Sequence, residues 1–240
     1  MRKTVEDGGG RWRTAEANVT VHEHQLTVRR TARYYTLGGG AAIREIWMVC
    51  HGYGQLAARF ARHFTAIAGP DRLIVVPEAL SRFYVDTAAR EVVGASWMTR
   101  EHRAAEIDDY VAYLDAVYEA AAGAARGARI TAFGFSQGAS TVSRWAALGH
   151  HAVSRLILWG GELPPDLDLQ AAAARFAELD TVLVHGTQDE IVTTKVVQGI
   201  VQRLKEHGVR HRLVEFEGGH EIDEEVLKEV VEDSTLNLDA

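Results

Sequence analysis

One short segment of the sequence has the residue types of an enzyme nucleophile. Residues 134–138 are Gly-Phe-Ser-Gln-Gly, after an apolar run and before a helical pattern over 139–148. In a tight strand-to-helix turn, small flanking residues leave the serine hydroxyl exposed, and the free N–H groups of the helix point toward it. We therefore expect Ser136 to attack a carbonyl carbon and the N–H of Gln137 to stabilise the oxyanion. The alternative is a glycine-rich turn with an incidental serine.

An acid and a histidine follow in the chain order that such a nucleophile requires. A serine at neutral pH needs a general base. Asp189 and His220 each come after a later apolar run, and two glycines precede His220. We expect His220 to take the serine proton, and Asp189 to fix its tautomer and stabilise the imidazolium. Glu190 and Glu162 are alternative acids.

An early loop can supply a second oxyanion donor. His51-Gly52-Tyr53-Gly54-Gln55 follows the apolar run 43–50. The loop after an early strand supplies this donor in proteins with a strand–serine–helix turn. We expect the N–H of Tyr53 to serve, with that of Gly54 as the alternative. His51 is interpreted as a residue that braces the loop through its ring nitrogens, with a second base as the alternative.

These residues require a scaffold that brings distant loops together. Apolar runs rich in Val, Ile and Leu predict strands buried on both faces at 43–50, 73–77, 129–135, 155–159, 181–185 and 212–216. Amphipathic patterns predict helices at 107–121, 139–148, 196–204 and 222–231. The alternation predicts an α/β fold with a mostly parallel sheet, helices on both faces, and a ligand site at the carboxyl ends of the strands. Alternating residues over 19–36 predict an N-terminal antiparallel hairpin at the sheet edge.

Composition narrows the function classes. The chain has 240 residues and a net charge of −7, with no basic run, which disfavours nucleic-acid binding. Its single cysteine, Cys50, excludes an intrachain disulfide and a multi-thiolate zinc site. Neither a secretory signal nor an apolar stretch of membrane-spanning length is visible. We expect one domain over 1–240, with a polar leader at 1–18, in the cytoplasm; the oligomeric state stays open.

Five segments together resemble the α/β-hydrolase superfamily, and within it the phospholipase/carboxylesterase group that includes acyl-protein thioesterases. They are His51-Gly52-Tyr53-Gly54, Gly134-Phe135-Ser136-Gln137-Gly138, Gly160-Gly161-Glu162-Leu163-Pro164, His185-Gly186-Thr187-Gln188-Asp189 and Gly218-Gly219-His220. The resemblance implies hydrolysis of carboxylic esters through an acyl-enzyme, without a metal or a cofactor.

Two segments depart from the group. Residues 1–42 are longer and more polar than its core, and the stretch 80–98 lacks a short loop typical of it. The second stretch, with Phe83 and Trp97, is either a lid or pocket wall, or a surface excursion that packs its aromatic side chains on the core. We expect Gly54, Gln55, Phe83 and Trp97 to line the substrate pocket.

The expected protein is a serine carboxylesterase acting on a small-molecule ester with a short to medium acyl chain. A lysophospholipase or acyl thioesterase is the alternative within enzymes. A non-catalytic ligand-binding protein of the same fold is the alternative from another class, and the presence of all three predicted triad residues argues against it.

Overall fold

A computed structural model of the chain describes residues 5–7, 11–13, 20–125 and 127–233. The chain divides into two compact units, Met1–Thr31 and Ala32–Ala240. In the first unit, strand β1 (Val5–Asp7) pairs antiparallel with β2 (Arg11–Arg13). The predicted polar leader lies largely outside the described residues, and the prediction of one domain over the whole chain stays a prediction.

The antiparallel pair at the sheet edge does not lie where the sequence pattern placed it. Residues 20–33 form no strand, and β3 (Tyr34–Gly38) pairs antiparallel with β5 (Arg72–Pro77) instead of with residues before it. The predicted hairpin over 19–36 is therefore wrong in its residues, although residue 19 itself lies outside the described ranges. Val21 and Leu26 are 78% and 86% exposed, so their alternation buries no apolar face.

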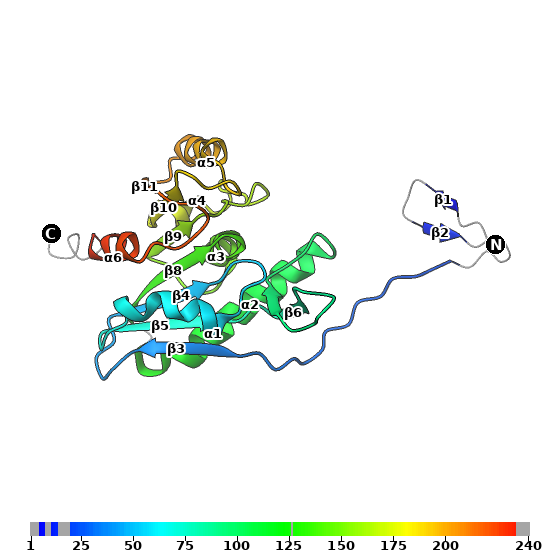
Figure 1. The fold of residues 1–240 in the computed structure, drawn as a ribbon, viewed down its shortest axis with the longest axis horizontal. Helices are drawn as coiled ribbons and strands as arrows, with labels where there is room; N and C mark the ends of the chain where they lie inside the picture. Colours follow the sequence, from blue (N-terminus) through cyan, green and yellow to red (C-terminus); the bar gives the residue numbers. More distant parts are fainter. Residues whose placement is uncertain (1–4, 8–10, 14–19, 126, 234–240) are drawn as a thin grey trace. The chain divides into compact units, whose positions relative to one another are not determined.

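The second unit is built on a seven-stranded sheet with the order β11-β10-β9-β8-β4-β5-β3 (Figure 1). All neighbouring strands are parallel except β3 and β5. The six predicted strands are confirmed, with ends shifted by at most two residues: β4 (Glu45–Cys50), β5 (Arg72–Pro77), β8 (Arg129–Phe135), β9 (Arg155–Trp159), β10 (Asp180–Gly186) and β11 (His211–Phe216). Parallel strands bring their carboxyl ends to one edge, so the loops that carry the predicted site residues share that edge.

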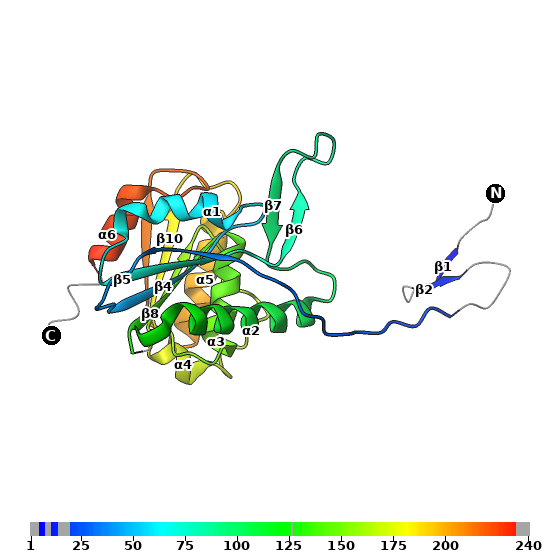
Figure 2. The same cartoon turned by 90° about the horizontal axis from the view of Figure 1, so that it is seen from below.

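Helices cover both faces of the sheet (Figure 2). One face carries α2 (Arg103–Ala122), α3 (Gln137–Leu148), α4 (Ala173–Ala177) and α5 (Thr194–Glu206). The other carries α1 (Ala57–Phe60), the 3₁₀ helix η1 (Ala61–Ile67) and α6 (Glu224–Glu232). A short 3₁₀ turn, η2 (Gly123–Ala125), follows α2. Within the ranges given above, no helix has the length and apolar character needed to cross a membrane, and the cytoplasmic location stays a prediction.

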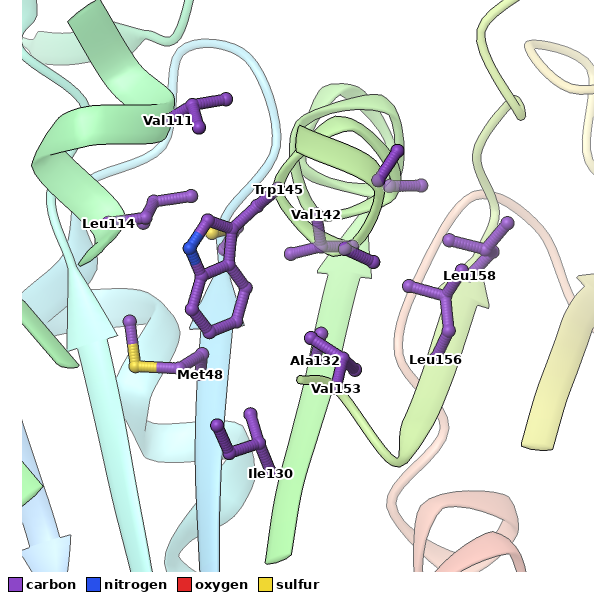
Figure 3. Packing of buried hydrophobic residues seen from close by; sticks show 14 of the residues in the cluster. Met48, Val111, Leu114, Ile130, Ala132, Val142, Trp145, Val153, Leu156 and Leu158 are labelled. Carbon is purple, nitrogen blue, oxygen red and sulfur yellow. The ribbon is translucent and has the colours of Figure 1, made fainter. Parts of the chain in front are cut away.

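The core fixes α3, the helix that begins after Ser136. Trp145 of α3 is fully buried beside Leu114 of α2 and Met48 of β4 (Figure 3). Its indole Nε1 donates a hydrogen bond of 2.8 Å to Oδ1 of Asp115, so the ring buries its area without leaving a polar atom unpaired. A helix anchored in this way holds its N-terminus in a fixed position.

The segment 80–98 forms a second antiparallel sheet, with β6 (Ser81–Tyr84) paired to β7 (Val93–Ser96). Figure 2 shows this hairpin projecting from the main sheet. Ala95 bonds the loop 51–55 on both sides, because its carbonyl accepts from the N–H of Gly54 (2.9 Å) and its N–H donates to the carbonyl of Gln55 (3.1 Å). The hairpin therefore supports that loop; whether it moves as a lid stays a prediction.

Candidate active site

The turn from β8 into α3 holds Ser136 in a strained conformation. Its φ of 54° and ψ of −118° are rarely adopted by residues with a side chain. Glycine is required on both sides, because a Cβ at Gly134 would lie 2.2 Å from the carbonyl oxygen of Gly138, and a Cβ at Gly138 would lie 2.1 Å from that of Cys50. The backbone N–H of Ser136 donates to the carbonyl of Trp159 at 2.9 Å, which ties the turn to β9. The predicted strand–serine–helix turn is confirmed.

Gln137 is the first residue of α3, and its backbone and its side chain have different roles. The first N–H groups of a helix have no partner within it, and the described residues provide no acceptor for the N–H of Gln137. The side chain is occupied elsewhere: Oε1 accepts from the N–H of Trp97 (3.1 Å), and Nε2 donates to the carbonyl of Met98 (2.9 Å). The backbone donor thus stays available at the positive end of the helix, while the amide side chain anchors the segment after β7.

His220 and Asp189 form a hydrogen-bonded pair. Nδ1 of His220 lies 2.7 Å from Oδ2 of Asp189, whose side chain is fully buried. Because the carboxylate can only accept, Nδ1 carries the proton and Nε2 is the basic nitrogen. Glu162 and Glu190, the alternative acids, are both exposed, and neither makes a hydrogen bond or an ion pair with His220 in the described chain.

The other oxygen of Asp189 is also held. Its Oδ1 accepts hydrogen bonds from the N–H groups of Ile191 (2.8 Å) and Val192 (2.9 Å). Burial raises the pKa of Asp189, but the hydrogen bond from His220 and these two backbone bonds outweigh burial and leave the pKa below its ordinary value. The carboxylate is therefore ionised at neutral pH, as the orienting partner of an imidazolium must be.

Phe135 and the two glycines after β9 lie against both His220 and the turn that holds Ser136. The rings of His220 and Phe135 are 4.9 Å apart between centroids. After β9, a Cβ at Gly160 would lie 3.4 Å from Nδ1 of His220, and a Cβ at the adjacent Gly161 would lie 2.6 Å from the carbonyl oxygen of Ser136. No hydrogen bond to the Ser136 hydroxyl is found among the described residues, and such bonds often tighten only when substrate is bound.

The loop 51–55 lies against the serine. A Cβ at Gly52 would be 3.2 Å from Cβ of Ser136, and the N–H of Gly52 donates to Oε1 of Gln55 at 2.8 Å. The N–H of Gly54, the alternative oxyanion donor, already donates to the carbonyl of Ala95 and is therefore not free to stabilise an oxyanion. The N–H of Tyr53 has no acceptor in the described part of the chain, which leaves it as the donor that this loop can offer.

The side chains of His51 and Trp97 hold the loop 51–55 through hydrogen bonds to its backbone. Nε2 of His51 accepts from the N–H of Ala79 (3.1 Å), so Nδ1 is protonated and donates to the carbonyl of Gly52 (2.8 Å). Burial lowers the pKa of His51, which keeps the ring neutral in this role. Nε1 of Trp97 donates to the carbonyl of His51 at 2.8 Å. The bracing role predicted for His51 is confirmed.

Comparisons with known proteins agree with this fold. Acyl-protein thioesterase 2 from Zea mays has a similar fold, with a TM-score of 0.70 at 19% identity over 87% of this chain and 100% of that one. A carboxylesterase from Mesorhizobium loti is also similar, with a TM-score of 0.63 at 20% identity over 84% of this chain and 94% of that one. Esterase PE8 has a TM-score of 0.62 at 18% identity over 86% of this chain and 99% of that one. No curated protein sequence matches the chain. Residues 40–235 match the phospholipase/carboxylesterase family. The chain belongs to this family.

Membership in the phospholipase/carboxylesterase family makes the protein an α/β-hydrolase, as predicted. The family match spans the loop 51–55, Ser136, Asp189 and His220. The site residues predicted from the sequence are thus brought to one edge of the sheet, except for the pocket residues considered next. Their catalytic roles stay predictions.

This phospholipase/carboxylesterase fold has a cavity of about 210 Å³ beside the loop 51–55. It is lined by residues 54–56, Arg59, Phe60, His63, Val92 and Val93. Gly54 and Gln55, which were predicted to line the substrate pocket, line this cavity, and its use by a substrate stays a prediction. Phe83 is not among the lining residues; its ring packs on Tyr53 with a centroid distance of 5.1 Å. Trp97 is 3% exposed and does not line this cavity either, so a place for Phe83 and Trp97 in a substrate pocket stays a prediction.

Sequence reasoning missed the residues contributed by α1 and η1. Phe60, Phe64 and Ile67 recur at helical spacing and are buried, so the signal for a helix here was present. Arg59 and His63 carry no such signal, because nothing in the local pattern connects them with the loop before α1.

Asp166 anchors the loop that follows Gly160 and Gly161. Arg103 of α2 donates two bonds of 3.1 Å to its carboxylate, and the buried Arg144 of α3 donates one of 2.6 Å. The hydrogen bond from Arg103, and then that from Arg144, lower the pKa of Asp166 to about 2. This ion pair network holds the loop from β9 to α4 against α2 and α3.

Proposed function

We propose that the protein is a serine carboxylesterase that hydrolyses esters with short to medium acyl chains through an acyl-enzyme. The observation that supports this most strongly is the 2.7 Å hydrogen bond between His220 and Asp189, in a chain that also holds Ser136 on a strained strand-to-helix turn. A serine, an oriented histidine and two free backbone N–H groups are the parts that acyl transfer requires.

In the first half of the proposed reaction, Nε2 of His220 takes the proton from Ser136 as its Oγ attacks the acyl carbon. The carbonyl oxygen becomes an oxyanion, which the N–H groups of Gln137 and Tyr53 stabilise. Asp189 stabilises the imidazolium. His220 then returns the proton to the leaving alcohol oxygen, the ester bond breaks, and the acyl group stays on Ser136.

In the second half, His220 takes a proton from water as the water attacks the acyl-enzyme. A second oxyanion forms in the same place. When it collapses, His220 returns the proton to Oγ of Ser136 and the free acid leaves. One set of residues thus serves both halves.

The direct test compares Ser136→Ala with Ser154→Ala on 4-nitrophenyl butyrate. Ser154 is exposed and precedes β9, at the opposite end of the strands. We expect Ser136→Ala to lower kcat about a thousandfold or more, because the nucleophile is lost, and Ser154→Ala to leave it within twofold. Activity of Ser136→Ala within tenfold of wild type would contradict the proposal.

A fluorophosphonate probe tests the non-catalytic alternative. An activated serine forms a covalent phosphonyl adduct, so intact-mass and peptide analysis should place one adduct on Ser136 in the wild type and none in Ser136→Ala. Absence of labelling in the wild type would favour a binding protein.

Hydrolysis of longer acyl chains or thioesters is the second candidate, since one similar structure is described as an acyl-protein thioesterase. A series of 4-nitrophenyl esters from acetate to palmitate, with the matching thioesters, separates the two. Rising kcat/KM beyond about eight carbons would favour the long-chain enzyme, because it needs an extended apolar channel.

A further inference from the structure

One of the residues that line the cavity beside the loop 51–55 is an exposed arginine, Arg59. Arg59 of α1 and His63 of η1 both line the cavity. Within the described chain, Arg59 has no side-chain hydrogen bond or ion pair, and no acidic residue is among those that line the cavity. Arg72 and Arg129, by contrast, are both paired with Glu45.

The cavity is one layer of residues away from the nucleophile. Gln55 lines the cavity and accepts a hydrogen bond from the N–H of Gly52, and a Cβ at Gly52 would lie 3.2 Å from Cβ of Ser136. Phe60 also lines the cavity, and its ring is 6.1 Å from that of Phe135, the neighbour of Ser136. A group held in the cavity could therefore belong to a substrate whose ester carbon reaches Ser136.

The remaining lining has a different character. Leu56, Phe60, Val92 and Val93 are apolar, so they favour a hydrocarbon segment. A guanidinium binds a carboxylate through two parallel hydrogen bonds. The volume of about 210 Å³ is below that of a pocket for a whole ligand, so it suits one end of a substrate.

We propose that this cavity binds a carboxylate at the end of a short apolar segment of the substrate, with Arg59 as the anion-binding residue. This inference rests on the proposed function, and it assigns the substrate class. The preferred substrates are monoesters of dicarboxylic acids, or esters formed at the hydroxyl group of a hydroxy acid whose carboxylate stays free, and neutral esters of the same length are poorer substrates.

The test uses matched pairs of esters. The rate of hydrolysis is measured from the base that must be added to hold the pH constant as acid is released. Monomethyl adipate against methyl hexanoate places the charge on the acyl side. The butyrate ester of 4-hydroxybutanoate against butyl butyrate places it on the alcohol side. We expect wild type to prefer the charged member of at least one pair, and Arg59→Gln to lower that preference about tenfold, mainly through KM.

Two variants control for charge and for folding. Arg62→Gln removes an exposed arginine of η1 that does not line the cavity, and it should leave the preference unchanged. Arg59→Lys keeps the charge and should restore part of the preference. Equal preferences in Arg59→Gln and wild type, or no preference in wild type for either pair, would overturn the inference.

A binding measurement separates this inference from the proposed reaction. Calorimetry with monomethyl adipate and with the butyrate ester, on Ser136→Ala and on Ser136→Ala combined with Arg59→Gln, needs no turnover. We expect a Kd about tenfold weaker in the double variant for the preferred ester. Hydrolysis of neutral esters, together with equal Kd values of the two variants for both charged esters, would refute the anion site alone. Binding that depends on Arg59, without hydrolysis or fluorophosphonate labelling, would refute the proposed function alone.

Discussion

The pair formed by His220 and Asp189 shows how much depends on single contacts. Asp189 uses both carboxylate oxygens, one for His220 and one for two backbone N–H groups. This leaves the imidazole one orientation and one tautomer, with Nε2 directed away from the acid. The residue beside Asp189, Glu190, is exposed and makes no such contact in the described chain.

Replacement of Asp189 by Asn should lower kcat about 10³–10⁴-fold with little change in KM. The amide can donate to Nδ1, which favours the wrong tautomer of His220 and removes the charge that stabilises the imidazolium. Steady-state kinetics on 4-nitrophenyl butyrate measures the effect, with Glu190→Gln and Glu162→Gln as controls expected within twofold of wild type. A larger loss in Glu162→Gln than in Asp189→Asn would reassign the acid.

Asp166 should affect stability in acid. Its pKa in the folded protein is about 2, below the ordinary value of 3.8, so its contribution to folding is fully present above pH 4 and is lost as the pH falls toward 2. Urea unfolding of wild type and Asp166→Asn should therefore show a difference in the free energy of unfolding at pH 5 that narrows by pH 2.5. A difference that stays constant over this range would show that Asp166 acts only through packing.

Among the elements, α3 and the hairpin β6–β7 illustrate what local patterns predict and what they miss. The apolar spacing after Ser136 predicted α3, because a helix that packs on a sheet must repeat its apolar residues every three or four positions. The stretch 80–98 was only recognised as unusual. Its pairing depends on partners in another loop, since Ala95 bonds both Gly54 and Gln55.

Two glycine substitutions in helices should have opposite effects. In Gly138→Ala the new Cβ would lie 2.1 Å from the carbonyl oxygen of Cys50, so we expect a loss of at least about 2 kcal/mol in the free energy of unfolding, together with lost activity. In Gly199→Ala, on α5, the new Cβ meets open space, and the higher helix propensity of alanine should add about 0.5–1 kcal/mol. Urea unfolding checks both, and similar effects of the two substitutions would contradict the close approach of α3 to β4.

For the molecule as a whole, we expect the edge strand β3 to be the first segment along the chain that the stability of the second unit requires. β3 covers the edge of β5, and Arg33 pairs with Glu78, whose side chain is 1% exposed. Arg82 is the other ion-pair partner of the Glu78 carboxylate in the described chain. Removal of these contacts would expose the edge of β5 and leave a buried carboxylate with one partner.

Two N-terminal deletions test this. Deletion of residues 2–31 retains β3 and Arg33, so we expect kcat/KM to stay within about twofold of wild type. Deletion of residues 2–40 removes both, and the free energy of unfolding should fall by about 3 kcal/mol or more, measured by urea unfolding. A similar stability for the two shortened chains would show that β3 contributes little.

The local patterns were sufficient for the six parallel strands and for the order Ser136, Asp189, His220. Burial on two faces leaves a visible apolar run, and parallel strands bring the ends of such runs to one edge whatever the loops do. The contacts between loops were beyond those patterns: that the Gln137 side chain bonds the segment after β7, that Ala95 occupies the N–H of Gly54, and that Arg59 lines a cavity. These depend on groups distant in sequence that meet only when the chain has packed, and a pattern of neighbouring residues does not contain that information.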